Sequence, residues 1–436
     1  MFNPPAISRK CIKNLFFCFT ENENGEEFIN LGRFKTLDMR HLLGATLLLL
    51  LGFMSCQSQH SAEKDIVPAA GRMGEYLPRL QDQRIAVVAN HTSRVDGVHL
   101  VDTLLARGVE IAKIFSPEHG FRGTGEAGEH IASYTDSLTG LPVVSLYGRS
   151  KKPDLSDLED VELVVFDIQD VGVRFYTYIS TMHYVMEACA QTNTRFLVLD
   201  RPNPNGFYVD GPVLDTQYQS FVGMHPIPLV HGMTIAELGR MINEQGWLKG
   251  GLRCNYDWVP CKNYTHDSLY RLPVPPSPNL PNMRSVYLYP SLGLLEGTVM
   301  NVGRGTETPF QVFGHPEMRS EGFTYTPRAI EGASTNPKYK GQVCRGINLR
   351  DYPLDSLTRH PRVRLKWLQQ AMQLMPERDI FLPFFKNLSG NQELLKQLRS
   401  GVPLEQIRQS WQPQMKDFMQ MRSKYLIYED YTRSSR

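Results

Sequence analysis

The first half of the chain alternates between short apolar runs and stretches with helical spacing. Five runs predict buried strands: residues 84–90 (RIAVVAN), 110–115 (EIAKIF), 142–146, 162–167 (ELVVFD) and 195–200 (RFLVLD). Helical spacing appears between the first two runs at residues 98–107, and again at residues 177–191. Strands that alternate with helices form parallel sheets whose faces are both covered. The pattern therefore predicts an α/β domain of Rossmann-like architecture with a mostly parallel sheet.

A proline-rich segment, Val274–Pro281 (VPPSPNLP), interrupts this pattern. Proline fixes φ and has no backbone N–H to donate, so the segment predicts extended chain and a domain boundary. We place the boundary after residue 275, which gives domains at residues 82–275 and 276–436. Residues 391–428 carry apolar positions at helical spacing and predict amphipathic helices in the second domain.

Composition narrows the class of protein. The chain has 436 residues, of which 41% are apolar and 21% charged, and this is long enough for two ordinary globular domains. A formal net charge of +2 lacks the cationic excess of a polyanion-binding surface, so nucleic acid is not expected as a partner. No CxxC pair occurs among the cysteines. Cys254 and Cys261 can pair with each other or remain two separate buried thiols.

A secretory signal is predicted from Met39 onward. Two basic positions precede an apolar run at residues 42–54, which is too short to span a membrane but fits a signal peptide. The run ends in a small residue and Cys56, as in a bacterial lipoprotein signal. The prediction is therefore an exported protein of the periplasm or cell envelope, anchored to a membrane through lipid on Cys56. The first 81 residues are interpreted as a mis-annotated extension, a lipoprotein-type signal and a linker: residues 1–38, 39–56 and 57–81.

Polar side chains gather where the predicted strands end. In a parallel sheet the carboxyl ends of the strands share one edge, and ligands bind outside that edge. Four of the predicted strands run into such clusters. Their members are the candidate binding residues Asn90, His119, Asp170, Arg174, Tyr176, Asp200, Arg201, Asn203 and Asn205. The sequence therefore predicts a cleft at this edge.

Glu118 follows Pro117 directly after the second predicted strand. A glycosidase needs one carboxyl group that donates a proton and a second that attacks the sugar or activates water. Glu118 fits the first role, and a loop carboxylate that caps backbone N–H groups is the structural alternative. The second role stays open, since the required separation is three-dimensional; the candidates are Glu126, Glu129, Asp170 and Glu296. Glu296 would come from the second domain and complete a site at the interface.

Residues 123–128 (GTGEAG) match the GxGxxG pattern of dinucleotide-binding loops. The glycines begin several residues after their strand, and Glu126 and Glu129 place negative charge where a pyrophosphate would bind. A loop over the cleft is the better interpretation, so no cofactor is predicted. Five histidines leave a metal site open, but none has HxH or HExxH spacing, and no metal is predicted; they are His91, His119, His130, His183 and His231.

Two arginines and two tyrosines suit a sugar ligand. Arg174 and Arg304 can each hold a carboxylate with two hydrogen bonds, as an acidic sugar requires. Tyr176 and Tyr178 can stack on a sugar face, although aromatic residues at such positions are as often core. His231 adds a hydrogen-bonding group of the kind found in sugar clefts.

Eight motifs together resemble a known enzyme family. They are SPEHG (116–120), FDIQDVGVRFYTY (166–178), LDRPNPNG (199–206), PLVHGMT (228–234), PPSPNLP (275–281), YPSLGLLEGT (289–298), NVGRGT (301–306) and KYLIY (424–428). In this order they resemble the exo-β-N-acetylmuramidases of glycoside hydrolase family 171. The likeness runs from about residue 82 to the C-terminus, so it covers both predicted domains.

The resemblance implies a Rossmann-like domain joined to a smaller α/β domain, with a cleft between them. It implies hydrolysis that releases N-acetylmuramic acid from the non-reducing end of peptidoglycan fragments, with muropeptides or disaccharides as partners. The catalytic glutamate of the family corresponds to Glu118 in SPEHG. Two other functions stay open at this point: a metal-dependent cell-wall amidase or deacetylase, and a non-catalytic muropeptide-binding lipoprotein.

Overall fold

The computed structural model describes residues 19–21, 27–29, 65–123, 132–148 and 150–432. The chain divides into two units, residues 1–64 and residues 65–436. In the first, β1 (Phe19–Glu21) and β2 (Glu27–Ile29) pair as antiparallel strands. The predicted signal and Cys56 lie outside the described residues. Within the described ranges, no helix has the length and apolar character needed to cross a membrane.

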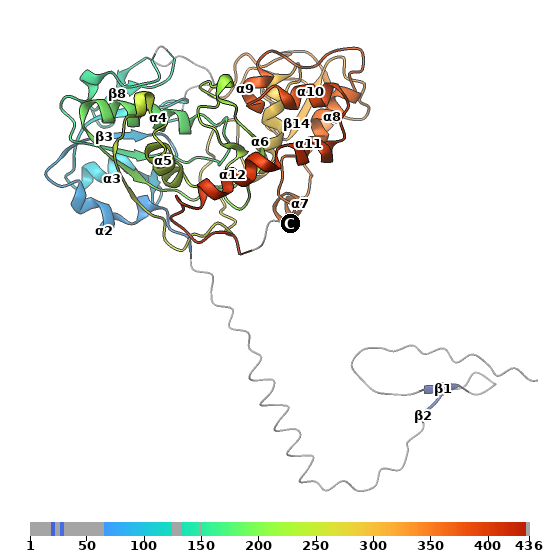
Figure 1. Ribbon diagram of the computed structural model, residues 1–436, viewed down its shortest axis with the longest axis horizontal. Helices are drawn as coiled ribbons and strands as arrows, with labels where there is room; N and C mark the ends of the chain where they lie inside the picture. Colours follow the sequence, from blue (N-terminus) through green and yellow to red (C-terminus); the bar gives the residue numbers. More distant parts are fainter. Residues whose placement is uncertain (1–18, 22–26, 30–64, 124–131, 149, 433–436) are drawn as a thin grey trace, which may run out of the picture. The chain divides into compact units, whose positions relative to one another are not determined.

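A seven-stranded sheet forms the centre of the second unit (Figure 1). Neighbouring strands pair in parallel, except that β7 runs antiparallel to β8 at one edge. The strands, in spatial order, are β13 (Asn255–Val259), β10 (Arg195–Leu199), β9 (Leu163–Asp167), β3 (Arg84–Ala89), β6 (Glu110–Ser116), β8 (Pro142–Ser145) and β7 (Tyr134–Thr135).

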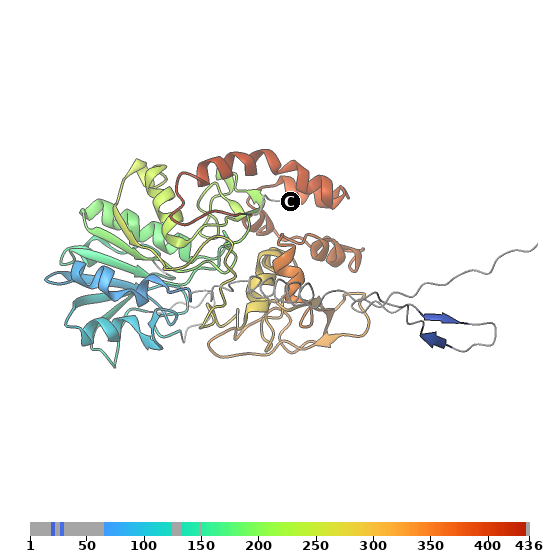
Figure 2. The same ribbon diagram turned by 90° about the horizontal axis from the view of Figure 1, so that it is seen from below.

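Helices cover both faces of this sheet (Figure 2). Alternate side chains of the central strand β3 enter different cores, because successive residues of a strand point to opposite faces. Ile85 and Val87 pack in the core under α2 and α3, whereas Ala86 and Val88 pack in the core under α4 and α5. The helices are α2 (Met73–Tyr76), α3 (Leu100–Ala106), α4 (Tyr178–Thr192) and α5 (Ile235–Glu244).

Smaller elements complete the two domains. The first domain also holds the antiparallel pairs β4–β5 and β11–β12, which are Arg94–Val95, Val98–His99, Asp210–Val213 and Pro228–Val230. The second domain has an antiparallel sheet of β14 (Val312–His315), β16 (Cys344–Asn348) and β15 (Thr324–Tyr325). Its helices are α6 (Met283–Leu292), α7 (Leu354–Arg359), α8 (Lys366–Gln373), α9 (Phe385–Ser389), α10 (Glu393–Arg399), α11 (Leu404–Ser410) and α12 (Gln412–Arg422).

The predicted fold class is confirmed. Every strand and helix predicted in the first domain is present, with its ends shifted by a residue or two. The sequence did not predict β13, in which exposed and half-buried residues alternate up to Val259 and leave no continuous apolar run. The boundary after residue 275 stays a prediction.

The end of the chain packs back on the first domain. The Tyr428 hydroxyl donates to Asp200 Oδ2 at 2.6 Å, and the backbone N–H of Ile427 donates to Glu237 Oε1 at 2.9 Å. Both carboxylates are buried. The segment after α12 therefore closes part of the core of the first domain, and the two domains share more than the chain that links them.

A buried ion pair joins two adjacent strands at the carboxyl edge of the large sheet. Arg201, just after β10, donates from Nε and Nη2 to the two carboxylate oxygens of Asp167 at the end of β9, at 2.6 and 2.8 Å. Both side chains are buried. Removal of one partner from such a pair leaves an uncompensated buried charge.

Arg201→Met is therefore expected to lower the free energy of unfolding by roughly 3–5 kcal/mol, measured by denaturant titration. The double variant Arg201→Met/Asp167→Leu should recover most of this loss, because it removes both charges. As a control, Arg359→Met breaks an exposed pair with Asp355 and should change stability by at most about 1 kcal/mol. A single variant at position 201 with wild-type stability would contradict this account.

Candidate active site

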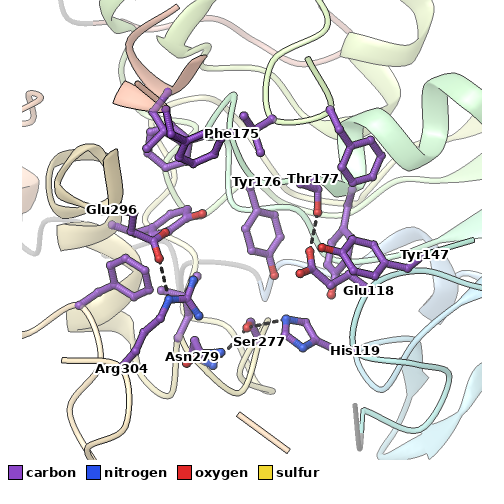
Figure 3. Close-up of a pocket in the computed structure, with 18 residues that line it drawn as sticks. Glu118, His119, Tyr147, Phe175, Tyr176, Thr177, Ser277, Asn279, Glu296 and Arg304 are labelled. Carbon is purple, nitrogen blue, oxygen red and sulfur yellow. Dashed lines mark hydrogen bonds and ion pairs between the residues drawn. The ribbon is translucent and has the colours of Figure 1, made fainter. Parts of the chain in front are cut away.

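A cavity of about 280 Å³ lies between the two domains, at the carboxyl edge of the large sheet (Figure 3). Its wall combines residues of the first domain, the proline-rich segment and the second domain. Polar and charged residues of the wall are Glu118, His119, Tyr147, Tyr176, Thr177, Tyr178, Ser277, Asn279, Tyr289, Glu296 and Arg304. Apolar residues of the wall are Phe175, Phe221, Val222, Leu280, Phe310, Phe384 and Leu388. Such a mixture of aromatic surface and a few polar groups is typical of a small-molecule site.

Glu118 lies on the side of the cavity formed by the first domain. It follows the end of β6, and the Thr177 hydroxyl donates to its Oε2 at 2.9 Å. Tyr147 lies beside it, and burial together with the Glu118 carboxylate raises the pKa of the Tyr147 phenol. The phenol is therefore a hydrogen-bond donor across the working pH range. Two hydroxyl groups thus fix where this carboxyl group points.

The backbone at His119 is unusual. Its φ of 71° lies in the left-handed region, which non-glycine residues rarely adopt and which concentrates at functional sites. The ring of His119 lines the cavity, and its Nε2 lies 3.2 Å from Ser277 Oγ. The turn after Pro117 therefore presents two consecutive side chains, Glu118 and His119, to the same space.

Glu296 lies across the cavity from Glu118, on the side formed by the second domain (Figure 3). It belongs to a 3₁₀ turn, Gly293–Gly297, that continues α6. Arg304 Nε donates to Glu296 Oε1 at 2.6 Å. In this contact the Glu296 carboxyl group accepts a hydrogen bond from a cation. The two carboxyl groups of the wall thus have different surroundings: hydroxyls on one, a guanidinium on the other.

The loop that carries Arg304 has a single conformation for steric reasons. Gly303 and Gly305 have φ of 82° and 80°, where a side chain is strained. A Cβ at Gly303 would lie 2.7 Å from Thr308 O. Asn301 Nδ2 donates to the Arg304 carbonyl at 3.1 Å, which closes the loop. The sequence NVGRGT therefore specifies the position of the guanidinium.

The proline-rich segment is part of the wall as well as a connection between domains. Tyr176 donates from its hydroxyl to Pro276 O at 2.7 Å, and His91 Nε2 lies 2.9 Å from Pro275 O. Both carbonyls thus bond side chains that follow the strands. The segment thereby brings Ser277 into the cavity.

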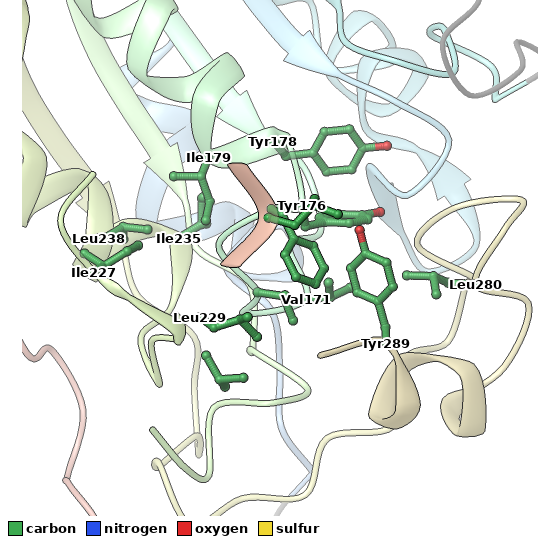
Figure 4. Close-up of a cluster of buried hydrophobic side chains, with 14 of the residues drawn as sticks. Val171, Tyr176, Tyr178, Ile179, Ile227, Leu229, Ile235, Leu238, Leu280 and Tyr289 are labelled. Atoms are coloured by element: carbon green, nitrogen blue, oxygen red, sulfur yellow. The ribbon is translucent and has the colours of Figure 1, made fainter. Parts of the chain in front are cut away.

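Three buried tyrosines form one part of the cavity wall. The rings of Tyr176 and Tyr178 meet edge to face with centroids 4.8 Å apart, and Tyr289 lies 6.0 Å from Tyr176. Figure 4 shows all three continuous with the buried apolar side chains of the first domain, such as Ile179. Burial raises the pKa of each phenol, so the inner wall carries no charge of its own.

Six of the residues singled out from the sequence line the cavity: Glu118, His119, Tyr176, Tyr178, Glu296 and Arg304. Glu126 lies outside the described residues. The structure places the other eight behind the wall, where they are buried and bonded to protein groups; they are Asn90, Asp170, Arg174, Asp200, Arg201, Asn203, Asn205 and His231. Arg174, for example, donates only to main-chain carbonyls, and Asn90 Nδ2 donates to the Tyr178 hydroxyl at 2.9 Å. Asn90 thereby supports a residue of the wall.

Sequence reasoning missed other wall residues, notably Tyr147, Thr177, Ser277 and Asn279. Tyr147 comes just after β8, so the strand-end rule would have found it had the third predicted strand been searched. Ser277 and Asn279 stand in the segment that was interpreted only as a boundary.

The remaining open alternatives concern metal ions and cysteines. Among the residues that the structure describes, no three His, Cys, Asp or Glu side chains converge as metal ligands would. Cys254 and Cys261 are separate, buried free thiols. Of the two pairing states left open by the sequence, the structure has the unpaired one.

An α/β domain and a smaller second domain each contribute a carboxyl group to one cavity, an arrangement that glycoside hydrolases use. Comparison with known proteins identifies the family. Two family models, described as the N-terminal and C-terminal parts of the exo-β-N-acetylmuramidase NamZ, match residues 85–284 and 287–428. The chain belongs to the NamZ family of exo-β-N-acetylmuramidases.

Individual relatives support this membership. A protein of Bacillus subtilis named peptidoglycan β-N-acetylmuramidase NamZ is 38% identical over 81% of this chain and 89% of its own length. Two crystal structures from Bacteroides fragilis, both described as DUF1343 family proteins, share the fold. BF0379 is 43% identical with a TM-score of 0.79, covering 84% of this chain and 100% of that chain. BF0371 is 29% identical with a TM-score of 0.70, covering 84% and 99%.

Asp170 is a buried carboxyl group behind the tyrosines of the inner wall. Its Oδ2 accepts a hydrogen bond from Gly172 N at 3.1 Å, while in the described part of the chain its Oδ1 has no partner. Burial raises the pKa of Asp170 from 3.8 to about 7. The folded protein thus holds this proton more tightly than the unfolded chain, where an aspartate has a pKa near 3.9.

The sign of the effect on stability follows by linkage. The stabilising contribution of Asp170 is fully present below about pH 4 and is lost as the pH rises through about 7. Asp170→Asn keeps a neutral side chain, so the variant should gain stability relative to wild type as the pH rises from about 4 to about 7, measured as free energy of unfolding. Parallel curves for the two proteins over this range would refute the assignment.

Proposed function

We propose that the protein is an exo-acting glycosidase that releases N-acetylmuramic acid from the non-reducing end of peptidoglycan fragments. The observation that carries the proposal is the pair of carboxyl groups, Glu118 and Glu296, on opposite sides of one cavity. The name of the Bacillus subtilis relative supports peptidoglycan as the substrate.

Glu118 acts as the proton donor to the glycosidic oxygen. It stands at a strand end that opens into the cavity, and the hydroxyl of Thr177 holds one carboxyl oxygen. Departure of the leaving sugar requires a proton on the oxygen that links it, and a positioned carboxyl group supplies that proton in most glycosidases.

Glu296 acts as the second carboxylate. Arg304 holds it ionised, which is the state needed either to attack the anomeric carbon or to take a proton from water. The positive charge that develops on the sugar ring in the transition state would face this carboxylate. The reaction then needs only the side chains of this chain and a water molecule.

The shape of the cavity suits exo action. Its volume of about 280 Å³ is near the lower end for small-molecule sites, which fits a single terminal sugar unit. Tyr176, Tyr178 and Tyr289 line its wall and are buried. A cavity of this size would take the terminal unit of a chain of sugars and leave the rest in solvent.

Glu118→Gln and Glu296→Gln are each expected to lose at least about 10²-fold in kcat on a chromogenic glycoside of N-acetylmuramic acid. The pH profiles of kcat/KM should separate the roles. Loss of the proton donor should remove the alkaline limb, and loss of the second carboxylate should remove the acidic limb.

Glu110→Gln is the matched control, because this exposed residue begins the same strand, β6, at the end away from the cavity. Thermal unfolding checks that each variant is folded. Full activity of either cavity variant would exclude that residue from catalysis, and a wild-type enzyme inactive on the glycoside would refute the proposed function itself.

We further propose that the protein is exported and anchored to a membrane through lipid on Cys56. The sequence pattern from Met39 to Cys56 supports this proposal. Expression in a bacterial host with a labelled fatty acid should label the wild-type protein and leave Cys56→Ser unlabelled, while Cys261→Ser, at a buried thiol, keeps the label. A mature protein that retains residues 1–55 would contradict the proposal.

A further inference from the structure

We infer that Arg304 binds the lactyl carboxylate of N-acetylmuramic acid and thereby selects this sugar over N-acetylglucosamine. The two sugars alternate in peptidoglycan and differ by the lactyl ether on O3, which carries the only negative charge of the muramic acid ring. The inference rests on the proposed function, since it names the group that recognises the substrate in the same cavity.

Arg304 has hydrogen-bonding capacity that the described residues do not use. Its Nε donates to Glu296, but its buried Nη1 has no acceptor among them. A buried N–H group without a partner is costly, and such groups in native structures call for an explanation. The guanidinium lines the cavity and faces its centre in Figure 3, so a ligand carboxylate there would satisfy it.

The charges on this side of the cavity favour an anion. Glu296 has two cations near it: Arg304, paired with its side chain, and Lys338, whose Nζ donates to the backbone carbonyls of Glu296 and Thr298 at 3.1 and 2.6 Å. Burial lowers the pKa of Lys338, and Glu296 opposes that shift. Two cations near one carboxylate leave positive potential for a second carboxylate to occupy.

The guanidinium is also held in place before substrate arrives. It stacks over the ring of Phe310, with Cζ 5.1 Å from the ring centroid, and its loop is fixed by Gly303 and Gly305. A preorganised arginine loses little freedom when it binds a carboxylate.

Arg174 is the other arginine proposed from the sequence as a carboxylate ligand. Its two terminal nitrogens already donate hydrogen bonds to the main chain. Its Nη1 donates to two main-chain carbonyls of the first domain and its Nη2 to two of α9. It lies behind the wall and does not line the cavity. Of the two arginines, only Arg304 has a free donor at the cavity.

This subsite also fixes how the sugar lies. Arg304 attracts a carboxylate, and it lies across the cavity from Glu118 (Figure 3). The lactyl group therefore turns toward the second domain. The glycosidic oxygen is on C1, two ring positions from C3, so it can lie on the side of Glu118, where the proton is needed.

The test compares two substrates in each enzyme: a chromogenic glycoside of N-acetylmuramic acid and its lactyl methyl ester, which keeps the shape but lacks the charge. The ratio of kcat/KM for acid over ester isolates the carboxylate contact, because damage to catalysis affects both substrates alike. Arg304→Met should lower this ratio by about 10- to 100-fold, the worth of a charge-assisted hydrogen bond. Arg304→Lys should lower the ratio less, since lysine keeps the positive charge but lacks the paired N–H donors of the guanidinium.

Lys338→Met is the matched control, because it removes a neighbouring cation that bonds only to backbone carbonyls. Its ratio should fall far less than that of Arg304→Met. Equal falls in the two variants would mean that the general potential, and not contact with Arg304, discriminates. An unchanged ratio in folded Arg304→Met would overturn the inference while leaving the proposed function intact, whereas an inactive wild type would refute the proposed function.

Discussion

The guanidinium of Arg174 donates hydrogen bonds to four main-chain carbonyls: Pro212 and Ile227 in the first domain, Leu388 and Ser389 in the second. It is buried, and no carboxylate shares its charge among those contacts. Four partly negative carbonyl oxygens compensate the cation, and the two of the second domain, Leu388 and Ser389, would lose this partner if the domains moved apart. Since the cavity needs a wall from each domain, this contact helps to hold the two walls together. A side chain that does not line the cavity thus contributes to its geometry.

The strand ends contribute in a similar, indirect way. Asp200 accepts hydrogen bonds from the Tyr428 hydroxyl and from Ala236 N at the start of α5, and Asp167 holds Arg201. Buried polar groups of this kind rigidify a structure when all of them are paired. The polar clusters at the carboxyl edge therefore form a scaffold that fixes the loops, and the loops place the few side chains that face the ligand.

The difference between buried scaffold residues and residues that face the ligand explains what the sequence could predict. Buried strands have continuous apolar runs, so the parallel sheet was predicted, and the edge rule located Glu118 next to a cavity. The same rule assigned Arg174, Asp200 and Arg201 to substrate because periodicity places a residue at an edge without giving the direction of its side chain. Ser277 and Asn279 were missed because a proline-rich segment predicts extended chain whether it links domains or lines a site. Direction and contact depend on tertiary packing, which no local pattern records.

The two sides of the cavity surround their carboxyl groups with different chemical groups. Glu118 stands on the large sheet, where Thr177 and Tyr147 surround it with hydroxyl groups. Glu296 stands on the second domain, where it accepts from Arg304 Nε, and Arg304 Nη1 has no acceptor among the residues that the structure describes. Carboxyl groups in such different surroundings can serve as proton donor and as anion at the same pH. Each carboxyl group belongs to a different domain, so the side chains around one are not those around the other. Substitutions near Arg304 can therefore change substrate recognition without disturbing the hydroxyl groups around the proton donor.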